Sequence, residues 1–362
     1  MSWRVGSWGV GVLTLALGCA TPEPAPPRSP APSDAVEPAP EVAAVEPSEP
    51  PERQTTDLEP EPDPVEVLMA LDGASSTSVG GPRDGSLTGG VALPSFGPGF
   101  RSNPRRPNAD AYYGTVEMVQ ALVHAAGVVH QALPGGEVTF NDLGFEEGGA
   151  IAHHGSHRAG RDVDVLFYLI DRQGEPMTSV GAFLDPRGRG FDFKDLSTPD
   201  DDVLVRMDVP RTWRFVQALL EGPHAAHVQR IFVVEHLRTM LLRHAERARV
   251  PSAIRARFAE VTCQPGAPHD DHLHIRFYCT PEDMADGCED SGPTYGWRRL
   301  ALREAGLRPV INRPRRDRPT APTTSAAEAR AAAGPMHSRV ESWLTRREAW
   351  LERPHPGRPF CR

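Results

Sequence analysis

Two short segments of the chain hold six of its 14 histidines, together with several aspartates. We call residues 153–165, HHGSHRAGRDVDV, the first histidine segment, and residues 269–277, HDDHLHIRF, the second histidine segment. Imidazole and carboxylate groups are ligands of divalent metal ions, and a catalytic zinc site takes three such ligands while water occupies the fourth position. The two segments therefore predict a catalytic metal site assembled from distant parts of the chain.

The spacing within each segment predicts which side chains share a face, because side chains alternate between the two faces of a strand. In the second segment, one face carries His272, His274 and Arg276, and the other carries Leu273, Ile275 and Phe277. In the first segment, one face carries Asp162 and Asp164, and the other carries Val163 and Val165. The apolar faces can pack against a core, which leaves the polar faces for solvent or a ligand.

A metal ion between the polar faces would take His157, Asp164 and His274 as ligands. Two neutral imidazoles and one carboxylate leave a zinc complex with a net positive charge, which favours deprotonation of a bound water near neutral pH. His272 stands beside a ligand, where it can accept and return a proton. The pattern predicts metal-assisted hydrolysis with His272 as the general base.

Both segments resemble the penicillin-insensitive murein endopeptidases, within the zinc metallopeptidase group that includes lysostaphin, the D-Ala-D-Ala peptidases and the hedgehog domain. The resemblance rests on HGSHxxGxDVDV at residues 154–165 and on HxxHxHxR at residues 269–276 followed by Cys279, and it spans roughly residues 75–290. It implies that His157, Asp164 and His274 bind zinc and that His272 is catalytic. It also implies active-site roles for His154 and His269, which would ligate a second ion or hold the oxyanion and substrate.

The chain departs from this family between the two segments, where the family also uses an aspartate and a histidine. Residues 190–195 contain no histidine, so we expect one zinc ion per chain and doubt a second. For His154 and His269, hydrogen bonding behind the ligands is the alternative to direct participation. Asp162 is expected to orient a ligand or its strand. Arg161 and Arg276 either contact a substrate carboxylate or are solvated or structural.

The resemblance implies hydrolysis of D-Ala–diaminopimelate cross-links of peptidoglycan, with no small-molecule cofactor and no serine nucleophile. One alternative is a D,D-carboxypeptidase or dipeptidase that trims stem peptides. Another is a non-catalytic peptidoglycan-binding lipoprotein. The preferred cross-link, the oligomeric state and the regulation stay open.

Residues 1–19 have the pattern of a secretory signal, because a single arginine precedes an apolar run too short to span a membrane. The segment ALGC at residues 16–19 resembles the lipobox of bacterial lipoproteins, which implies lipidation of Cys19. Ala20 follows the cysteine, and the absence of aspartate there implies sorting to the outer membrane. We therefore expect a periplasmic protein anchored to the outer membrane.

Residues 20–66 form a proline-rich, acidic stretch that holds 14 of the 38 prolines and 12 acidic residues against two basic ones. Such a composition cannot bury enough apolar surface to fold, so we expect an extended, disordered linker. The stretch accounts for essentially the whole net charge of −9, which leaves the rest of the chain close to neutral. No nucleic-acid partner is expected.

We expect an α+β peptidase domain over residues 67–290, with a mostly antiparallel central sheet and flanking helices, similar to the hedgehog and D-Ala-D-Ala peptidase domains. Apolar periodicity predicts helices over residues 112–133, 212–220 and 236–249, and strands over residues 137–143, 162–169, 230–234 and 272–278. Residues 291–362 form an Arg- and Pro-rich C-terminal extension, in which residues 338–351 are expected to form a helix.

Four cysteines remain once Cys19 is set aside, an even number that suggests disulfides in an oxidising compartment. Cys279 and Cys288 are close in sequence and are expected to pair. Cys263 and Cys361 are the remaining two, and whether they pair stays open.

Overall fold

The computed structural model describes residues 62–104, 108–192, 196–266 and 268–313, residues 324–351 and Cys361. The predicted signal segment, Cys19 and the predicted linker up to residue 61 lie outside these residues. The last residues of that predicted linker instead begin helix α1 (Pro64–Met69), which is capped by a hydrogen bond from the backbone N–H of Val65 to the Asp63 carboxylate. No helix in the described part of the chain has the length and apolar character that a membrane crossing requires.

A seven-stranded sheet forms the centre of the molecule, with the strand order β14-β13-β15-β8-β7-β5-β4. Its strands are β4 (Phe96–Gly97), β5 (Phe100–Ser102), β7 (Val138–Phe140), β8 (Asp162–Leu166), β13 (Val228–Phe232), β14 (Thr262–Cys263) and β15 (His272–Phe277). Neighbouring strands are antiparallel except in the pairs β13–β14 and β5–β7, which are parallel. The predicted α+β class is confirmed, and the central sheet is mixed.

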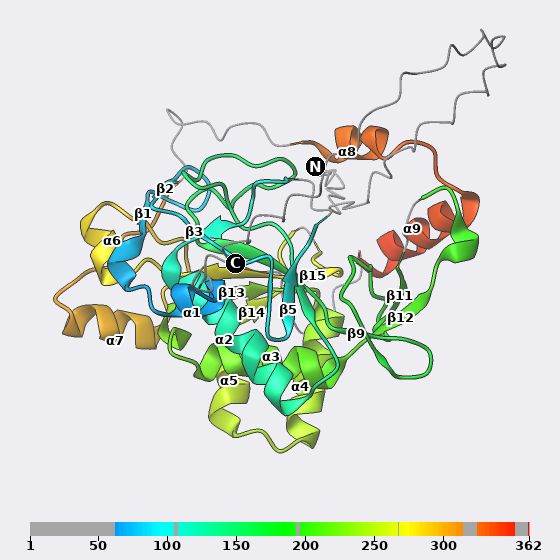
Figure 1. Ribbon diagram of the computed structural model, residues 1–362, viewed down its shortest axis with the longest axis horizontal. Coiled ribbons are helices and arrows are strands. Elements are labelled where there is room, and N and C mark those ends of the chain that lie inside the picture. The colour runs from blue at the N-terminus through cyan, green and yellow to red at the C-terminus, as the bar shows by residue number, and fades with distance from the viewer. Residues whose placement is uncertain are drawn as a thin grey trace, which may run out of the picture.

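Four helices lie together on one side of the central sheet, below it in Figure 1. They are α2 (Val116–Ala132), α3 (Val209–Glu221), α4 (Glu235–Arg247) and α5 (Ser252–Val261). Helix α3 packs against the other three, and α5 also packs against β13. Val163 and Val165 of β8 and Leu273 and Ile275 of β15 belong to the buried core. Because side chains alternate along each strand, the polar residues of β8 and β15 lie on the opposite face.

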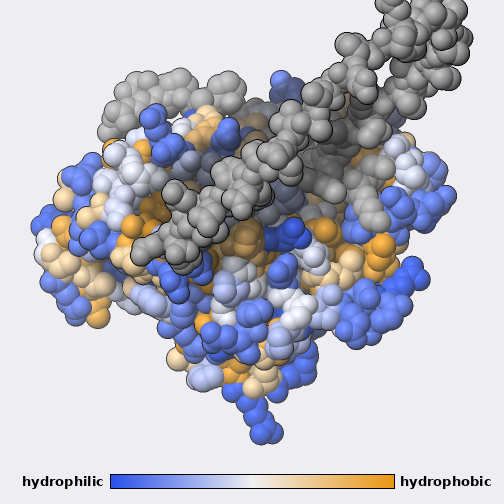
Figure 2. Space-filling model, viewed as in Figure 1, coloured by the Kyte–Doolittle hydropathy of each residue, from blue (hydrophilic) through white to orange (hydrophobic). Residues whose placement is uncertain are grey.

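Smaller sheets and short helices surround this framework. A second sheet, of order β10-β9-β12-β11, contains β9 (Leu169–Ile170), β10 (Pro176–Met177), β11 (Arg189–Phe191) and β12 (Leu204–Met207). Two two-stranded sheets pair β1 (Thr77–Val79) with β2 (Ser86–Thr88), and β3 (Val91–Ala92) with β6 (Tyr113–Gly114). The 3-10 helices are η1 (Gly73–Ser75), η2 (Pro199–Asp201) and η3 (Ala225–His227). Figure 2 shows apolar residues in scattered groups among hydrophilic ones on this face, as is ordinary for a protein surface.

The C-terminal part adds α6 (Pro281–Ala285), α7 (Gly296–Glu304), α8 (Ala326–Ala332) and α9 (Ser338–Leu351). Figure 1 places α9 beside β11 and β12 of the second sheet. The rings of Phe191 in β11 and Trp343 in α9 meet edge to face, with centroids 5.2 Å apart. The C-terminal extension thus packs on the domain through its helix.

The elements differ from the predicted ones mainly at their ends. The strand expected to reach Leu169 ends at Leu166, and Leu169 begins β9 in the second sheet. The helix expected from residue 112 begins at Val116, because Tyr113 and the next residue pair with β3. Helix α5 was missed, although its apolar residues Ile254, Phe258 and Val261 have helical spacing.

Two disulfides are present among the described residues. The expected bond joins Cys279 and Cys288, both of which are buried. A second bond joins Cys263 to Cys361 across a sequence separation of 98 residues. This second bond ties the end of the C-terminal extension to strand β14.

Candidate active site

Strands β8 and β15 bring the two histidine segments together. Their antiparallel register places His274 opposite Asp164 and Arg276 opposite Asp162. All four side chains lie on the face that points away from the helices, and all are buried. The sequence pattern therefore correctly predicted which polar residues share a face.

Three imidazole nitrogens converge on one carboxylate oxygen, Asp164 Oδ1. His157 Nε2 lies 3.5 Å from it, His272 Nε2 lies 3.4 Å from it, and His274 Nδ1 also lies 3.4 Å from it. Asp164 Oδ1 and His157 Nε2 are buried without a hydrogen-bond partner. Buried polar atoms nearly always have partners, so this arrangement is unusual for a site formed by protein atoms alone.

The donor set fits a zinc ion. Ligand atoms that lie about 2.0–2.1 Å from a tetrahedral zinc are about 3.3–3.4 Å from each other. The distances of 3.4 and 3.5 Å from Asp164 Oδ1 to the ring nitrogens match this spacing. Imidazole nitrogen and carboxylate oxygen are also the ligand types that zinc prefers. Two groups of possible metal ligands lie here among the described residues, namely His154, His157 and Asp164 in one and His269, His272 and His274 in the other. The predicted ligands His157 and Asp164 share the first group, whereas the predicted ligand His274 belongs to the second.

Hydrogen bonds behind the site fix the orientation of two imidazoles. His157 Nδ1 donates to the backbone carbonyl of Leu143 at 2.7 Å. His274 Nε2 donates to Asp162 Oδ1 at 2.7 Å, and Arg276 Nε donates to the same oxygen at 2.6 Å. Each ring therefore presents its other nitrogen toward Asp164. A hydrogen bond at the rear nitrogen commonly selects the tautomer of a metal-binding histidine.

His154 is buried in the same cluster, beside His157 and Asp164. Its Nε2 donates to Asp142 Oδ2 at 2.8 Å, and its Nδ1 lies 3.5 Å from Asp164 Oδ2. Asn108 Nδ2 donates to the same oxygen of Asp142 at 3.2 Å. Sequence reasoning missed Asp142, because only the pairing of β7 with β8 brings this residue, two positions after β7, to the site.

His269 and His272 occupy the other side of the site. His272 Nδ1 donates to Asp271 Oδ1 at 2.8 Å, while its Nε2 faces Asp164. The ring of His269 lies 4.9 Å from that of His272 and 5.4 Å from that of His274, between centroids. Asp271 was not predicted to have a role. Its place beside His272 is that of a group that orients a general base.

Three histidines of the two segments have strained backbone. His153, His157 and His269 have φ angles of 68°, 69° and 52°. Only one other described non-glycine residue, Arg249, has a positive φ. Such conformations cost of order 1–3 kcal/mol and are concentrated at functional sites. His153 itself is half-buried and lies outside the convergent group around Asp164.

The family model of the penicillin-insensitive murein endopeptidases matches residues 78–296. The chain belongs to this family. Two proteins named penicillin-insensitive murein endopeptidase, from Klebsiella pneumoniae subsp. pneumoniae and from Klebsiella pneumoniae strain 342, are each 28% identical to it over 229 residues. These alignments cover 61% of this chain and 72% of each relative. The matched residues include both histidine segments and end before α8 and α9.

The imidazoles of this murein endopeptidase family member differ in their pKa values. Burial is the main reason that the pKa of His274 is lowered to about 4, and it outweighs the hydrogen bond to Asp162. Burial also disfavours the charged form of His272, but Asp164 and Asp271 outweigh it and raise the pKa of His272 well above its usual value. Their carboxylates thus stabilise a proton on His272, whereas His274 is neutral near pH 7.

The two aspartates of β8 are held in the charged form. Burial opposes ionisation of Asp164, but the surrounding histidines hold its pKa well below the usual range. Burial likewise opposes ionisation of Asp162, and Arg276 and His274 lower its pKa strongly. Metal ligands must be deprotonated, so charged Asp164 and neutral His274 are in the form that binds a metal.

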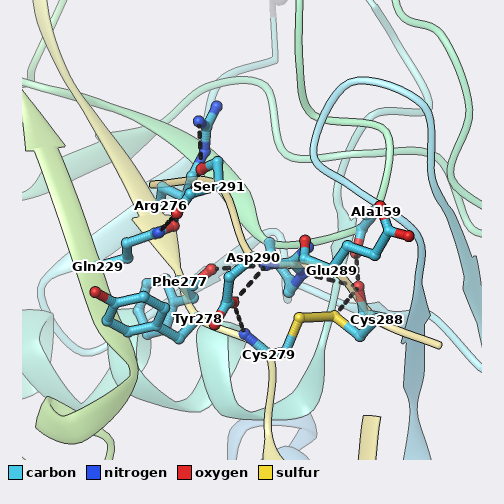
Figure 3. A network of polar contacts seen from close by, with 12 residues as sticks. Ala159, Gln229, Arg276, Phe277, Tyr278, Cys279, Cys288, Glu289, Asp290 and Ser291 are labelled. Atoms are coloured by element: carbon cyan, nitrogen blue, oxygen red, sulfur yellow. Dashed lines mark hydrogen bonds and ion pairs between the residues drawn. A yellow bond between two sulfur atoms is a disulfide. The ribbon is translucent and has the colours of Figure 1, made fainter. Parts of the chain in front are cut away.

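The two arginines considered for substrate binding have structural roles among the described contacts. Arg161 is 1% exposed, and its guanidinium donates to the Ser78 hydroxyl and to three backbone carbonyls. Arg276 Nη1 donates to the Ser291 hydroxyl at 3.1 Å, and that hydroxyl in turn contacts Gln229. Figure 3 shows Arg276, Ser291 and Gln229 in one network beside the Cys279–Cys288 disulfide. This network holds Arg276, which donates to the same oxygen of Asp162 as His274.

Proposed function

We propose that this protein is a zinc-dependent murein endopeptidase that hydrolyses D-Ala–diaminopimelate cross-links of peptidoglycan. The observation that carries the proposal is the convergence of three imidazole nitrogens on the buried Asp164 Oδ1 without hydrogen bonds. Membership of the family and the names of the two Klebsiella relatives support the peptidase activity and the murein substrate. The cross-link comes from the resemblance of the two histidine segments.

One Zn²⁺ per chain would be held by His157 Nε2, Asp164 Oδ1 and His274 Nδ1. When bound, the ion would polarise the scissile carbonyl and lower the pKa of a water molecule. His274 is assigned as the third ligand because it lies directly opposite Asp164 in the strand register. A second ion is not part of the proposal.

A bound cation would offset the charge of Asp164, which is one of the two groups that raise the pKa of His272. His272 would then be able to act as the general base and afterwards return the proton to the leaving amine. Asp271 keeps the Nδ1–H of His272 directed away from the reacting atoms, so that Nε2 faces them. His269 would donate to the oxyanion of the tetrahedral intermediate, since its ring lies beside both histidines of β15. His154, fixed by Asp142, would serve behind the ligands. No serine nucleophile takes part, so β-lactams are not expected to acylate this enzyme.

The N-terminal segments fit a peptidoglycan substrate. We propose that residues 1–19 direct export, that Cys19 is lipidated, and that the protein acts in the periplasm from the outer membrane. Residues 20–61 would then separate the lipid from the domain, and an extended chain spans about 3.1 Å per residue. Cleavage would be confined to the wall within reach of the membrane.

Digestion of purified sacculi tests the function. Wild-type enzyme, His274→Ala, His272→Ala and the exposed control His130→Ala are compared by chromatography of the soluble products, with zinc content measured on each. We expect wild type and His130→Ala to convert cross-linked dimers into monomers. His272→Ala should retain zinc and lose about 100-fold to 10,000-fold in rate. His274→Ala should lose both zinc and activity.

Equal activity of wild type and His274→Ala would contradict the site assignment. Release of terminal residues with dimers left intact would favour a D,D-carboxypeptidase or dipeptidase. Binding to sacculi without soluble product, unchanged by a chelator, would favour a non-catalytic peptidoglycan-binding protein.

A further inference from the structure

A buried ion pair connects the C-terminal extension to the second histidine segment. Arg347 of α9 donates from Nε to Asp270 Oδ2 at 2.8 Å and from Nη2 to Asp270 Oδ1 at 2.7 Å. Asp270 is fully buried, and Arg347 is 8% exposed. The guanidinium also lies over the ring of Phe183, 3.9 Å from its centroid. Bidentate pairs of this kind fix geometry, and removal of one buried partner is costly because the other charge is left unpaired.

Asp270 occupies a position from which its displacement would move the catalytic histidines. It stands between His269 and Asp271, and Asp271 in turn orients His272. The carbonyl of His269 accepts a hydrogen bond from Val234 N at 3.0 Å, and the carbonyl of Asp270 accepts one from Leu184 N at 2.9 Å. The strained φ of 52° at His269 needs surrounding contacts to maintain it. The bidentate ion pair with Arg347 holds Asp270, the residue next to His269.

His269 and Asp270 lie in the connection between β14 and β15, and the C-terminal extension also contacts the beginning of this connection. The disulfide joins Cys361 to Cys263, and Cys361 N donates to the carbonyl of Gln264 at 2.8 Å. Gln264 Oε1 accepts a hydrogen bond from Glu235 N at 2.9 Å, at the start of α4. The C-terminal extension therefore holds the β14–β15 connection, which contains His269, near both of its ends. Both contacts come from residues outside the part of the chain that the family model matches.

We propose that Arg347 is a positioning residue of the active site, which acts through Asp270 to hold the backbone from His269 to His272 in the catalytic arrangement. The C-terminal extension is then part of the working enzyme. As a statement about catalysis, this rests on the proposed function. The positioning of residues 269–272 by Arg347 depends only on the ion pair, so it can be measured without an activity assay.

The kinetic test uses the full chain with Arg347→Met, Arg347→Lys and the control Arg339→Met. Arg339 lies on the same helix and pairs with Asp200, and this ion pair is exposed, unlike the buried pair of Arg347 and Asp270. Steady-state rates are measured on a soluble cross-linked muropeptide dimer, per zinc-loaded and folded enzyme. Arg347→Met should lower kcat by about 10-fold to 100-fold with little change in KM. Arg347→Lys should recover part of kcat, because it restores the charge without the fork geometry. Arg339→Met should match wild type.

A second measurement keeps the inference testable if substrate hydrolysis fails. Hydrogen exchange of the amides of residues 269–272 should be faster in Arg347→Met and unchanged in Arg339→Met. If the folded wild type does not hydrolyse the dimer, the proposed function fails, and hydrogen exchange alone decides the positioning role. Wild-type kcat in Arg347→Met, no recovery in Arg347→Lys, or unchanged exchange at residues 269–272 would each overturn the inference.

Discussion

At the residue scale, the site is defined by which nitrogen of each imidazole is left free. His274 has its Nε2 occupied by Asp162, so Nδ1 is the nitrogen that faces Asp164. For His157 the choice is reversed, because Leu143 occupies Nδ1 and leaves Nε2 free. The two rings thus offer different nitrogens to the same point, and the fold makes that choice before any ligand binds.

The role of Asp162 behind His274 leads to a prediction about metal affinity. In Asp162→Asn, the charged acceptor at Nε2 is replaced by a neutral amide, so the basicity of Nδ1 falls and the tautomer is less well fixed. We expect zinc affinity to fall by about 10-fold to 100-fold. Competition with a chromophoric chelator measures the dissociation constant, and exposed Asp200→Asn serves as the control. An unchanged affinity would show that His274 does not bind zinc through Nδ1.

At the scale of helices and strands, the sequence predicted those features that leave a periodic pattern of apolar and polar residues. The alternation along β8 and β15 identified the residues that share the polar face, since a period of two survives in any twisted sheet. Asp142 was not predicted, because a single aspartate after a three-residue strand gives no sequence pattern that indicates a role. The second sheet escaped because strands of two to four residues, such as β9 (Leu169–Ile170), leave too little periodicity to read.

The short helix α6 (Pro281–Ala285) buries an acid, and this sets a pH dependence of stability. Burial and the charge of Glu117 raise the pKa of Asp283 to about 7, against lowering contributions from the Ser78 backbone N–H and from Arg161. The unfolded chain loses this proton near pH 3.9. Between about pH 4 and 7 the folded state therefore binds the extra proton. The free energy of unfolding should fall by up to about 1.4 kcal/mol for each unit of rising pH.

Urea denaturation of wild type and Asp283→Asn at pH 5 and pH 7 isolates this contribution. The comparison with the variant is needed because burial lowers the pKa of His227 to about 4, which makes stability rise with pH over part of the same range. Wild type should lose more stability than Asp283→Asn between the two pH values, and Glu304→Gln, at an exposed position of α7, should behave as wild type. Parallel pH profiles for wild type and Asp283→Asn would show that Asp283 is ionised in the folded state.

At the scale of the whole molecule, the peptidase domain and its C-terminal extension form one structure. The sequence predicted a helix over residues 338–351, and α9 has those bounds, but nothing in the pattern indicated what it contacts. Arg347 lies 77 residues from Asp270, and Cys361 lies 98 residues from Cys263. Contacts over such separations have no local signature, so only the folded structure shows that the extension reaches the site.

The long-range disulfide and the buried ion pair should act together, because both hold the connection between β14 and β15. Replacing both cysteines, as Cys263→Ser with Cys361→Ser, leaves no unpaired thiol and should lower the free energy of unfolding by about 2–5 kcal/mol. It should also lower kcat, since the start of the connection is released. When Arg347→Met is added, the combined loss of kcat should be smaller than the product of the separate losses, because the second change releases a segment that is already loosened. Kinetics of the three variants on a cross-linked muropeptide measure this coupling, and losses that simply multiply would show that the two contacts act on separate parts of the enzyme.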